Sequence, residues 1–73
     1  MLMVVHARKL KTLSKKVKKL REDKSLTQEQ LATKIGVSAA YIGFIEQGER
    51  TPSVKTADKL ARVFGIKLSE LFD

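Results

Sequence analysis

The most informative side chains in this sequence are the basic ones. Their number and their concentration in one part of the chain would allow the protein to bind a polyanion. The 73 residues carry a formal net charge of +7, and residues 1–24 alone hold nine Lys or Arg against two acidic residues. Such a concentrated excess is typical of nucleic-acid binders, although a solvated, lysine-rich helix face would give the same count. The nine are Arg8, Lys9, Lys11, Lys15, Lys16, Lys18, Lys19, Arg21 and Lys24.

Side chains that could support catalysis or bind a metal are too few to form a site. The chain contains one histidine, His6, and no cysteine, and its acidic residues are scattered. This composition offers neither a nucleophile beside a base nor a cluster of metal ligands. We therefore expect a protein that is not an enzyme and that has no cofactor, no metal and no small-molecule ligand.

The apolar start of the chain, residues 1–5, is much shorter than the roughly 20 residues that span a bilayer. It also lacks the basic beginning and the longer apolar stretch of a signal peptide. We expect a cytoplasmic protein with no membrane partner.

The basic residues are expected to lie on helices. Apolar residues recur in steps of three and four from residue 10 to residue 20, which is the spacing of one face of a helix. This stripe predicts a first helix over residues 13–23. Thr27 and Gln30 then have the spacing of a capping box, which predicts the start of a second helix. Gly36 can adopt the left-handed conformation that ends it.

Three further helices are predicted in the rest of the chain. Ser38 is a cap candidate for a third helix, which ends before Gly48. Ser53, which follows a proline, is the cap candidate for a fourth helix that Gly65 ends. The apolar cluster of residues 66–72 predicts a short fifth helix. The expected fold class is therefore all-α, a five-helix bundle without a sheet.

The second and third predicted helices together have the pattern of a helix-turn-helix, from about Thr27 to Gln47. The turn between them is short and contains Gly36. Where the helices cross, Ala32 must be small, because a larger side chain would hold them apart. Each of these residues is weak evidence alone, but their order is specific. The wedge between the helices is filled by Leu31, Ile35, Val37, Ile42 and Ile45.

The sequence resembles the Cro/repressor-type, xenobiotic-response-element-like helix-turn-helix regulators, and is similar to phage repressors and restriction-modification controller proteins. The resemblance rests on residues 26–53, LTQEQLATKIGVSAAYIGFIEQGERTPS, continues through KTADKLARVFGIKLSELF, and covers residues 13–72. It implies a lambda-repressor-like five-helix domain that binds double-stranded DNA. It also implies a homodimer on a two-fold operator, with the third helix in the major groove.

The resemblance assigns the base-facing positions to the third helix. This set offers one hydroxyl and no Arg, Asn or Gln, so bidentate hydrogen bonds to guanine or adenine are largely absent. We therefore expect recognition through thymine methyl groups, water bridges and DNA shape. For Phe44, packing or contact with a partner is an alternative role. The base-facing residues are Ser38, Ala39, Ala40, Gly43 and Phe44.

Phosphate contacts are expected from the start of the second helix, from the third helix and from the loop that follows it. Gln28 and the neighbouring amides lie at the start of the second helix, where the helix dipole favours an anion that Thr27 can share. Such contacts position a protein on DNA without specifying sequence. For Arg50 and Lys55, ordinary surface charge is the alternative. The resemblance adds Tyr41, Gln47, Arg50, Thr51 and Ser53, with Lys55 in reach.

Arg21 and Glu46 match a pair that forms a salt bridge in similar repressors. The resemblance implies that this bridge joins the first helix to the end of the third, with the arginine near a phosphate. Breaking a buried pair costs about 3–5 kcal/mol, whereas breaking an exposed one costs about 0–1 kcal/mol.

The chain departs from the family pattern at its two ends. Residues 1–11 extend beyond the minimal domain of residues 12–73 and are expected to form a basic arm that contacts the DNA backbone. Lys67 stands where a small capping residue is common, which predicts a weakly capped last helix. Because so small a bundle cannot cover every apolar residue near its end, we expect a dimer through Ile66, Leu68 and Phe72.

Two other functions are compatible with the same fold. The small face of the third helix could dock a protein, as in an antitoxin-like module. The lysine-rich arm could instead serve an RNA-binding or coactivator module. A footprint over two half-sites about one helical turn apart would favour the operator-binding protein.

Overall fold

Five helices make up the computed structural model, which describes the backbone of residues 2–73 and the side chains of residues 12–73. No strand occurs in this range, so the expected all-α, five-helix fold is confirmed. None of the described helices has both the length and the apolar character needed to cross a membrane. The helices are α1 (Leu2–Asp23), α2 (Gln28–Ile35), α3 (Ala39–Glu46), α4 (Val54–Phe64) and α5 (Leu68–Leu71).

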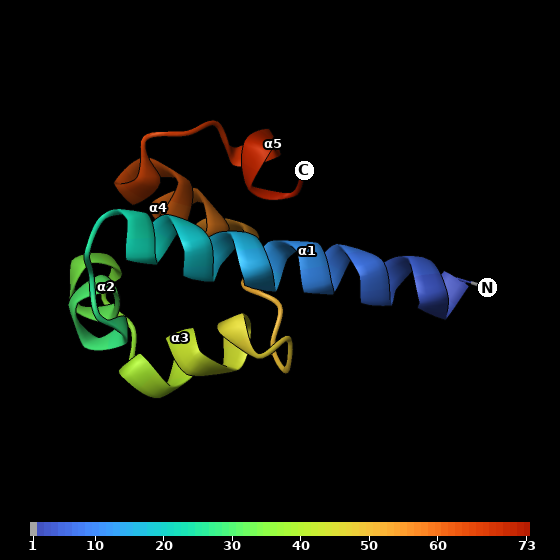
Figure 1. Ribbon diagram of the computed structural model, residues 1–73, viewed down its shortest axis with the longest axis horizontal. Helices are drawn as coiled ribbons and strands as arrows, with labels where there is room; N and C mark the ends of the chain where they lie inside the picture. The colour runs from blue at the N-terminus through green and yellow to red at the C-terminus, as the bar shows by residue number, and fades with distance from the viewer. Residues whose placement is uncertain (1) are drawn as a thin grey trace.

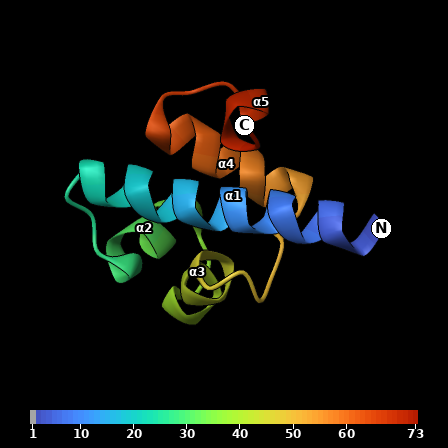
Figure 2. The same ribbon diagram turned by 45° about the vertical axis from the view of Figure 1, so that its right-hand side comes forward.

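Helix α1 is the central element of the bundle (Figures 1 and 2). It runs between the pair α2 and α3 on one side and the pair α4 and α5 on the other, while its N-terminal part projects past the other helices. The core lies where the C-terminal half of α1 meets the other four helices. The largest fully buried side chains are Val17, Leu31, Ile42, Ile45, Leu60 and Leu71.

The predicted start of the first helix at residue 13 is wrong, because α1 begins at Leu2. The apolar stripe on which the prediction rested reports which residues are buried, and a helix can continue beyond its buried part. Residues 2–12 contain neither Gly nor Pro, and Leu, Met, Ala, Lys and Arg are good helix formers. The side chains of the expected arm, residues 1–11, lie outside the described residues.

The predicted ends of α2 and the predicted cap of α3 are confirmed. The Thr27 hydroxyl oxygen accepts from the Gln30 amide at 3.0 Å, and Gln30 Oε1 accepts from the Thr27 amide at 2.8 Å, which completes the capping box. Gly36 ends α2 with φ of 75°, in the left-handed region. Ser38 then caps α3 by accepting from the Tyr41 amide at 3.1 Å. The end of α2 and the start of α3 are thus both defined, and the turn between them is short.

The two last helices also begin and end close to where they were predicted. Ser53 caps α4 through the Thr56 amide at 3.1 Å, and Gly65 ends this helix. Lys67 supplies no side-chain cap to α5, as expected. The start of α5 is nevertheless supported, because the Glu70 carboxylate accepts from the Lys67 amide at 2.9 Å.

Candidate nucleic-acid interface

An open groove separates the N-terminus of α2 from the outward face of α3. Most of the residues that the sequence assigned to base and phosphate contacts meet there, although they come from two helices. Three of the lining residues on α3 are small, namely Ala39, Ala40 and Gly43. The groove is lined by Arg21, Thr27, Gln28, Glu29, Ala39, Ala40, Gly43, Phe44 and Gln47.

The remaining expected contacts lie outside this groove. Ser38 is exposed, and its hydroxyl oxygen already caps α3. Tyr41 is half-buried and packs against the core. Arg50, Thr51, Ser53 and Lys55 are exposed on the loop after α3 and on the first turn of α4, and the Ser53 hydroxyl oxygen caps α4. These four residues form a second group of polar side chains beyond the C-terminal end of α3.

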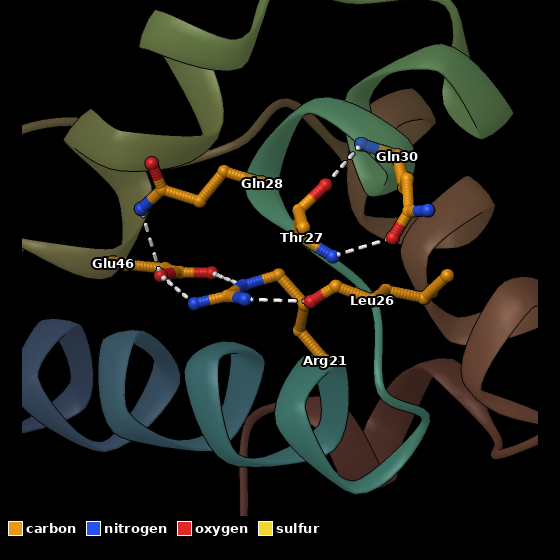
Figure 3. A network of polar contacts seen from close by, with 6 residues as sticks. All are labelled: Arg21, Leu26, Thr27, Gln28, Gln30 and Glu46. Atoms are coloured by element: carbon orange, nitrogen blue, oxygen red, sulfur yellow. Dashed lines mark hydrogen bonds and ion pairs between the residues drawn. The ribbon is translucent and has the colours of Figure 1, made fainter.

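Arg21 and Glu46 form a buried ion pair between α1 and α3 (Figure 3). Arg21 Nε lies 2.6 Å from Glu46 Oε2, and Nη2 lies 3.1 Å from Oε1. The side chains are only 11% and 3% exposed, so this is a buried pair, and removing one partner is expected to cost about 3–5 kcal/mol of stability. Arg21 Nη1 also donates to the Leu26 carbonyl at 2.7 Å, which ties the chain before α2 to the same group.

The pKa of Arg21 is raised above its usual range, first by its hydrogen bonds to Glu46 and then by the nearby carboxylate charges, which outweigh burial. A raised pKa of a basic group means that its contribution to stability is fully present below the pKa of the unfolded chain. That contribution is lost only as the pH rises through the folded value. Arg21 therefore stays charged at every pH at which DNA binding would be measured.

Gln28 is linked to the same carboxylate, a contact that the sequence did not indicate. Its Nε2 donates to Glu46 Oε1 at 3.1 Å across the groove (Figure 3). The amide also lies over Gly43: a Cβ on that glycine would be 3.7 Å from Gln28 Oε1 and 3.8 Å from Nε2. One N–H and the carbonyl oxygen of Gln28 remain for other contacts. Since the two residues are 18 positions apart on different helices, no local spacing could have revealed this bond.

Comparison with known proteins shows the family of the chain. The pattern of the helix-turn-helix family matches residues 17–71. The chain belongs to the helix-turn-helix family.

Two relatives and one solved structure show how far the similarity extends. An uncharacterized HTH-type transcriptional regulator of Archaeoglobus fulgidus is 42% identical over 57 residues, which are 78% of this chain and 80% of that protein. Control protein C.MunI of Mycoplasma is 43% identical over 58 residues, which are 78% of each chain. The crystal structure of the restriction-modification controller protein C.AhdI from Aeromonas hydrophila superposes with a TM-score of 0.80 at 36% identity, covering 86% of this chain and 96% of that one.

Membership of the helix-turn-helix family decides the broad class of the protein. Its relatives include HTH-type transcriptional regulators, an immunity repressor of Bacillus phage phi105 and control protein C.MunI, and the similar structure is that of a restriction-modification controller protein. The chain is therefore a DNA-binding transcriptional regulator and not an enzyme, as its composition predicted.

A substitution at Gly43 tests how closely the Gln28 amide packs on α3, with the stability of the protein as the measured quantity. It lies inside α3, where Gly is about 1 kcal/mol less favourable than Ala. A methyl group there would meet the Gln28 amide at ordinary contact distance. We expect Gly43→Ala to raise the free energy of unfolding by about 0.5–1 kcal/mol, as measured by urea denaturation.

Gly36→Ala is the matched control, because Gly36 has φ of 75° and its new methyl group would meet nothing within 4 Å. In this variant only the strained backbone conformation is unfavourable, and we expect the free energy of unfolding to fall by about 1 kcal/mol. Destabilisation by Gly43→Ala would show that the Gln28 amide cannot yield to a methyl group.

Proposed function

We propose that the protein binds a two-fold symmetric DNA operator as a homodimer, with α3 in the major groove. The observation that carries this proposal is the juxtaposition of an exposed α3 face with the N-terminus of α2 in one open groove. On the first turn of α3, Ala39 and Ala40 carry small side chains, which allows the backbone there to come close to base edges.

Phosphates are proposed to bind at both ends of α3. At one end the first-turn amides of α2 point outward, and the helix dipole favours an anion beside Thr27 and Gln28. At the other end Arg50, Thr51 and Lys55 are exposed. Tyr41, Gln47 and Ser53 complete the set of proposed contacts. Two anchors on either side of α3 would set its register along the duplex.

Base recognition is proposed to depend little on hydrogen bonds. Ala39, Ala40 and Gly43 carry no polar side chain, and the Ser38 hydroxyl oxygen already accepts from the Tyr41 amide, which leaves its proton and one lone pair for other hydrogen bonds. Apolar contact with thymine methyl groups and sequence-dependent DNA shape remain as sources of specificity.

The proposed dimer uses the end of the chain. Phe72 is 41% exposed, and Ile66 and Leu68 are only half-buried beside it in sequence. Leu71, in contrast, is fully buried in the core. A second copy would cover these exposed apolar groups, and its two-fold axis would give the operator its symmetry.

Selection of bound duplexes from a random pool, followed by footprinting, tests this proposal. We expect thymine-rich half-sites related by two-fold symmetry, with centres about one helical turn apart. Strong guanine preference under α3 would overturn the base-recognition part, and asymmetric sites would overturn the dimer. Salt-sensitive binding that ignores sequence, or that prefers RNA, would favour the RNA-binding alternative.

A charge placed on α3 supplies a matched pair of variants for the same assay. Ala40→Glu puts a carboxylate in the proposed interface at an exposed position, and Thr33→Glu adds the same charge on the outer side of α2. Only Ala40→Glu is expected to abolish operator binding. Equal loss in both variants would point to net charge and not to α3.

A further inference from the structure

The loop after α3 places one cation directly against an aromatic ring. The Arg50 Cζ atom lies 5.8 Å from the centre of the Phe44 ring, which is within the range of a cation–π contact. Phe44 is 39% exposed and lines the groove. In the described part of the chain, Arg50 has no carboxylate within ion-pair distance. The outward side of its guanidinium is thus available to an anion.

The backbone holds the same two residues together. The Phe44 carbonyl accepts from the Glu49 amide at 2.9 Å and from the Arg50 amide at 3.2 Å. Gly48, with φ of 77°, allows the chain to turn back in this way. Residue 50 is therefore fixed next to residue 44 before any side chain is considered.

We propose that Phe44 acts on DNA through Arg50, as a positioning residue and not as a reader of bases. The ring orders the guanidinium beyond the end of α3, where it meets a phosphate of the DNA backbone. A free arginine loses much rotamer freedom when it binds, and a guanidinium already stacked on a ring loses less. This inference rests on the proposed function, and it replaces the expected contact between Phe44 and a thymine methyl group.

A double-mutant cycle on the selected duplex tests the inference with Phe44→Leu, Arg50→Gln and the double variant. Arg50→Gln is expected to weaken binding and to lower the slope of log affinity against log salt by about 0.9, the value for one lost phosphate contact. Phe44→Leu is expected to weaken binding about two- to fivefold on every sequence. In the Arg50→Gln background the same change should have no effect, and Phe44→Tyr should retain the affinity.

Lys55 provides the control, because it is another exposed cation near the loop and has no ring contact in the described residues. The effects of Lys55→Gln and Phe44→Leu should be additive. An equal loss from Phe44→Leu with and without Arg50, or an altered base preference at one position, would overturn the inference.

A second measurement needs no DNA and separates the inference from the proposed function. The side-chain protons of Arg50 should show ring-current shifts in the NMR spectrum of the free protein, and Phe44→Leu should remove them. Absence of these shifts in the unsubstituted protein would overturn the positioning role. A wild-type protein that shows the shifts but binds no duplex would instead overturn the proposed function.

Discussion

Glu46→Gln is expected to lower the free energy of unfolding by about 3–5 kcal/mol. The substitution keeps the shape of the side chain but removes its charge, so Arg21, whose side chain is only 11% exposed, loses the carboxylate with which it forms an ion pair. For a domain of this size each kcal/mol shifts the melting temperature by roughly 4–8 °C. Thermal unfolding followed by circular dichroism would therefore show a fall of more than about 10 °C.

The exposed pair Lys19 and Asp23 is the matched control for this prediction. Lys19 Nζ lies 3.4 Å from Asp23 Oδ2, but the two side chains are 76% and 58% exposed. Asp23→Asn is expected to cost no more than about 1 kcal/mol. Similar losses from Glu46→Gln and Asp23→Asn would contradict the buried role of Glu46.

Removing both charges of the buried pair gives a further check. Arg21→Met combined with Glu46→Leu should be clearly more stable than Glu46→Gln alone, because no unpaired charge remains. The double variant loses the hydrogen bonds from Arg21 to Leu26 and from Gln28 to Glu46. It should therefore fold and yet bind DNA less well, since these bonds fix the N-terminus of α2 against α3.

Neutralising the basic arm is expected to have the largest effect on DNA binding. The backbone of residues 2–11 belongs to α1, whose N-terminal part projects past the other helices (Figures 1 and 2), so the basic residues of the arm stand on a continuous helix. With Arg8, Lys9 and Lys11 changed to Gln, the slope of log affinity against log salt should fall by about 2.7 units, which is 0.9 for each of three phosphates. Affinity measured at several salt concentrations gives this slope.

An equal loss of charge on another face separates arm contacts from net charge. Lys24, Lys34 and Arg62 line hollows away from the α2 and α3 groove, and their change to Gln should leave the slope nearly unaltered. If the arm variant keeps the wild-type slope, or if both variants lower it equally, residues 1–11 do not contact the DNA backbone.

Much of the fold could be predicted because its helix ends are encoded locally. Thr27, Ser38 and Ser53 cap their helices through amides three residues away, and Gly36 and Gly65 end helices in the left-handed conformation. The start of α1 could not be predicted in this way. No Gly or Pro lies near residue 13, Thr12 and Ser14 lie inside α1 although Thr and Ser often cap helices, and the apolar pattern there reports only where the buried part begins.

The residues of the candidate site could be predicted from the sequence, but the contacts between them could not. The sequence pattern and the family resemblance indicated Gln28, Glu46, Phe44 and Arg50 as separate residues with separate roles. The structure joins them in pairs, through the bond from Gln28 to Glu46 and the stacking of Arg50 on Phe44.

By itself, the sequence determined the helix-turn-helix, four of the five helix starts and the basic character of the first third of the chain. These features depend on local spacing, on capping and on charge, which act within a few residues. Only the tertiary structure decided that the Arg21–Glu46 pair is buried, that Gln28 shares its carboxylate and that α1 projects past the bundle. Burial and contact between distant residues depend on how the helices pack, and that packing is set by the whole core at once.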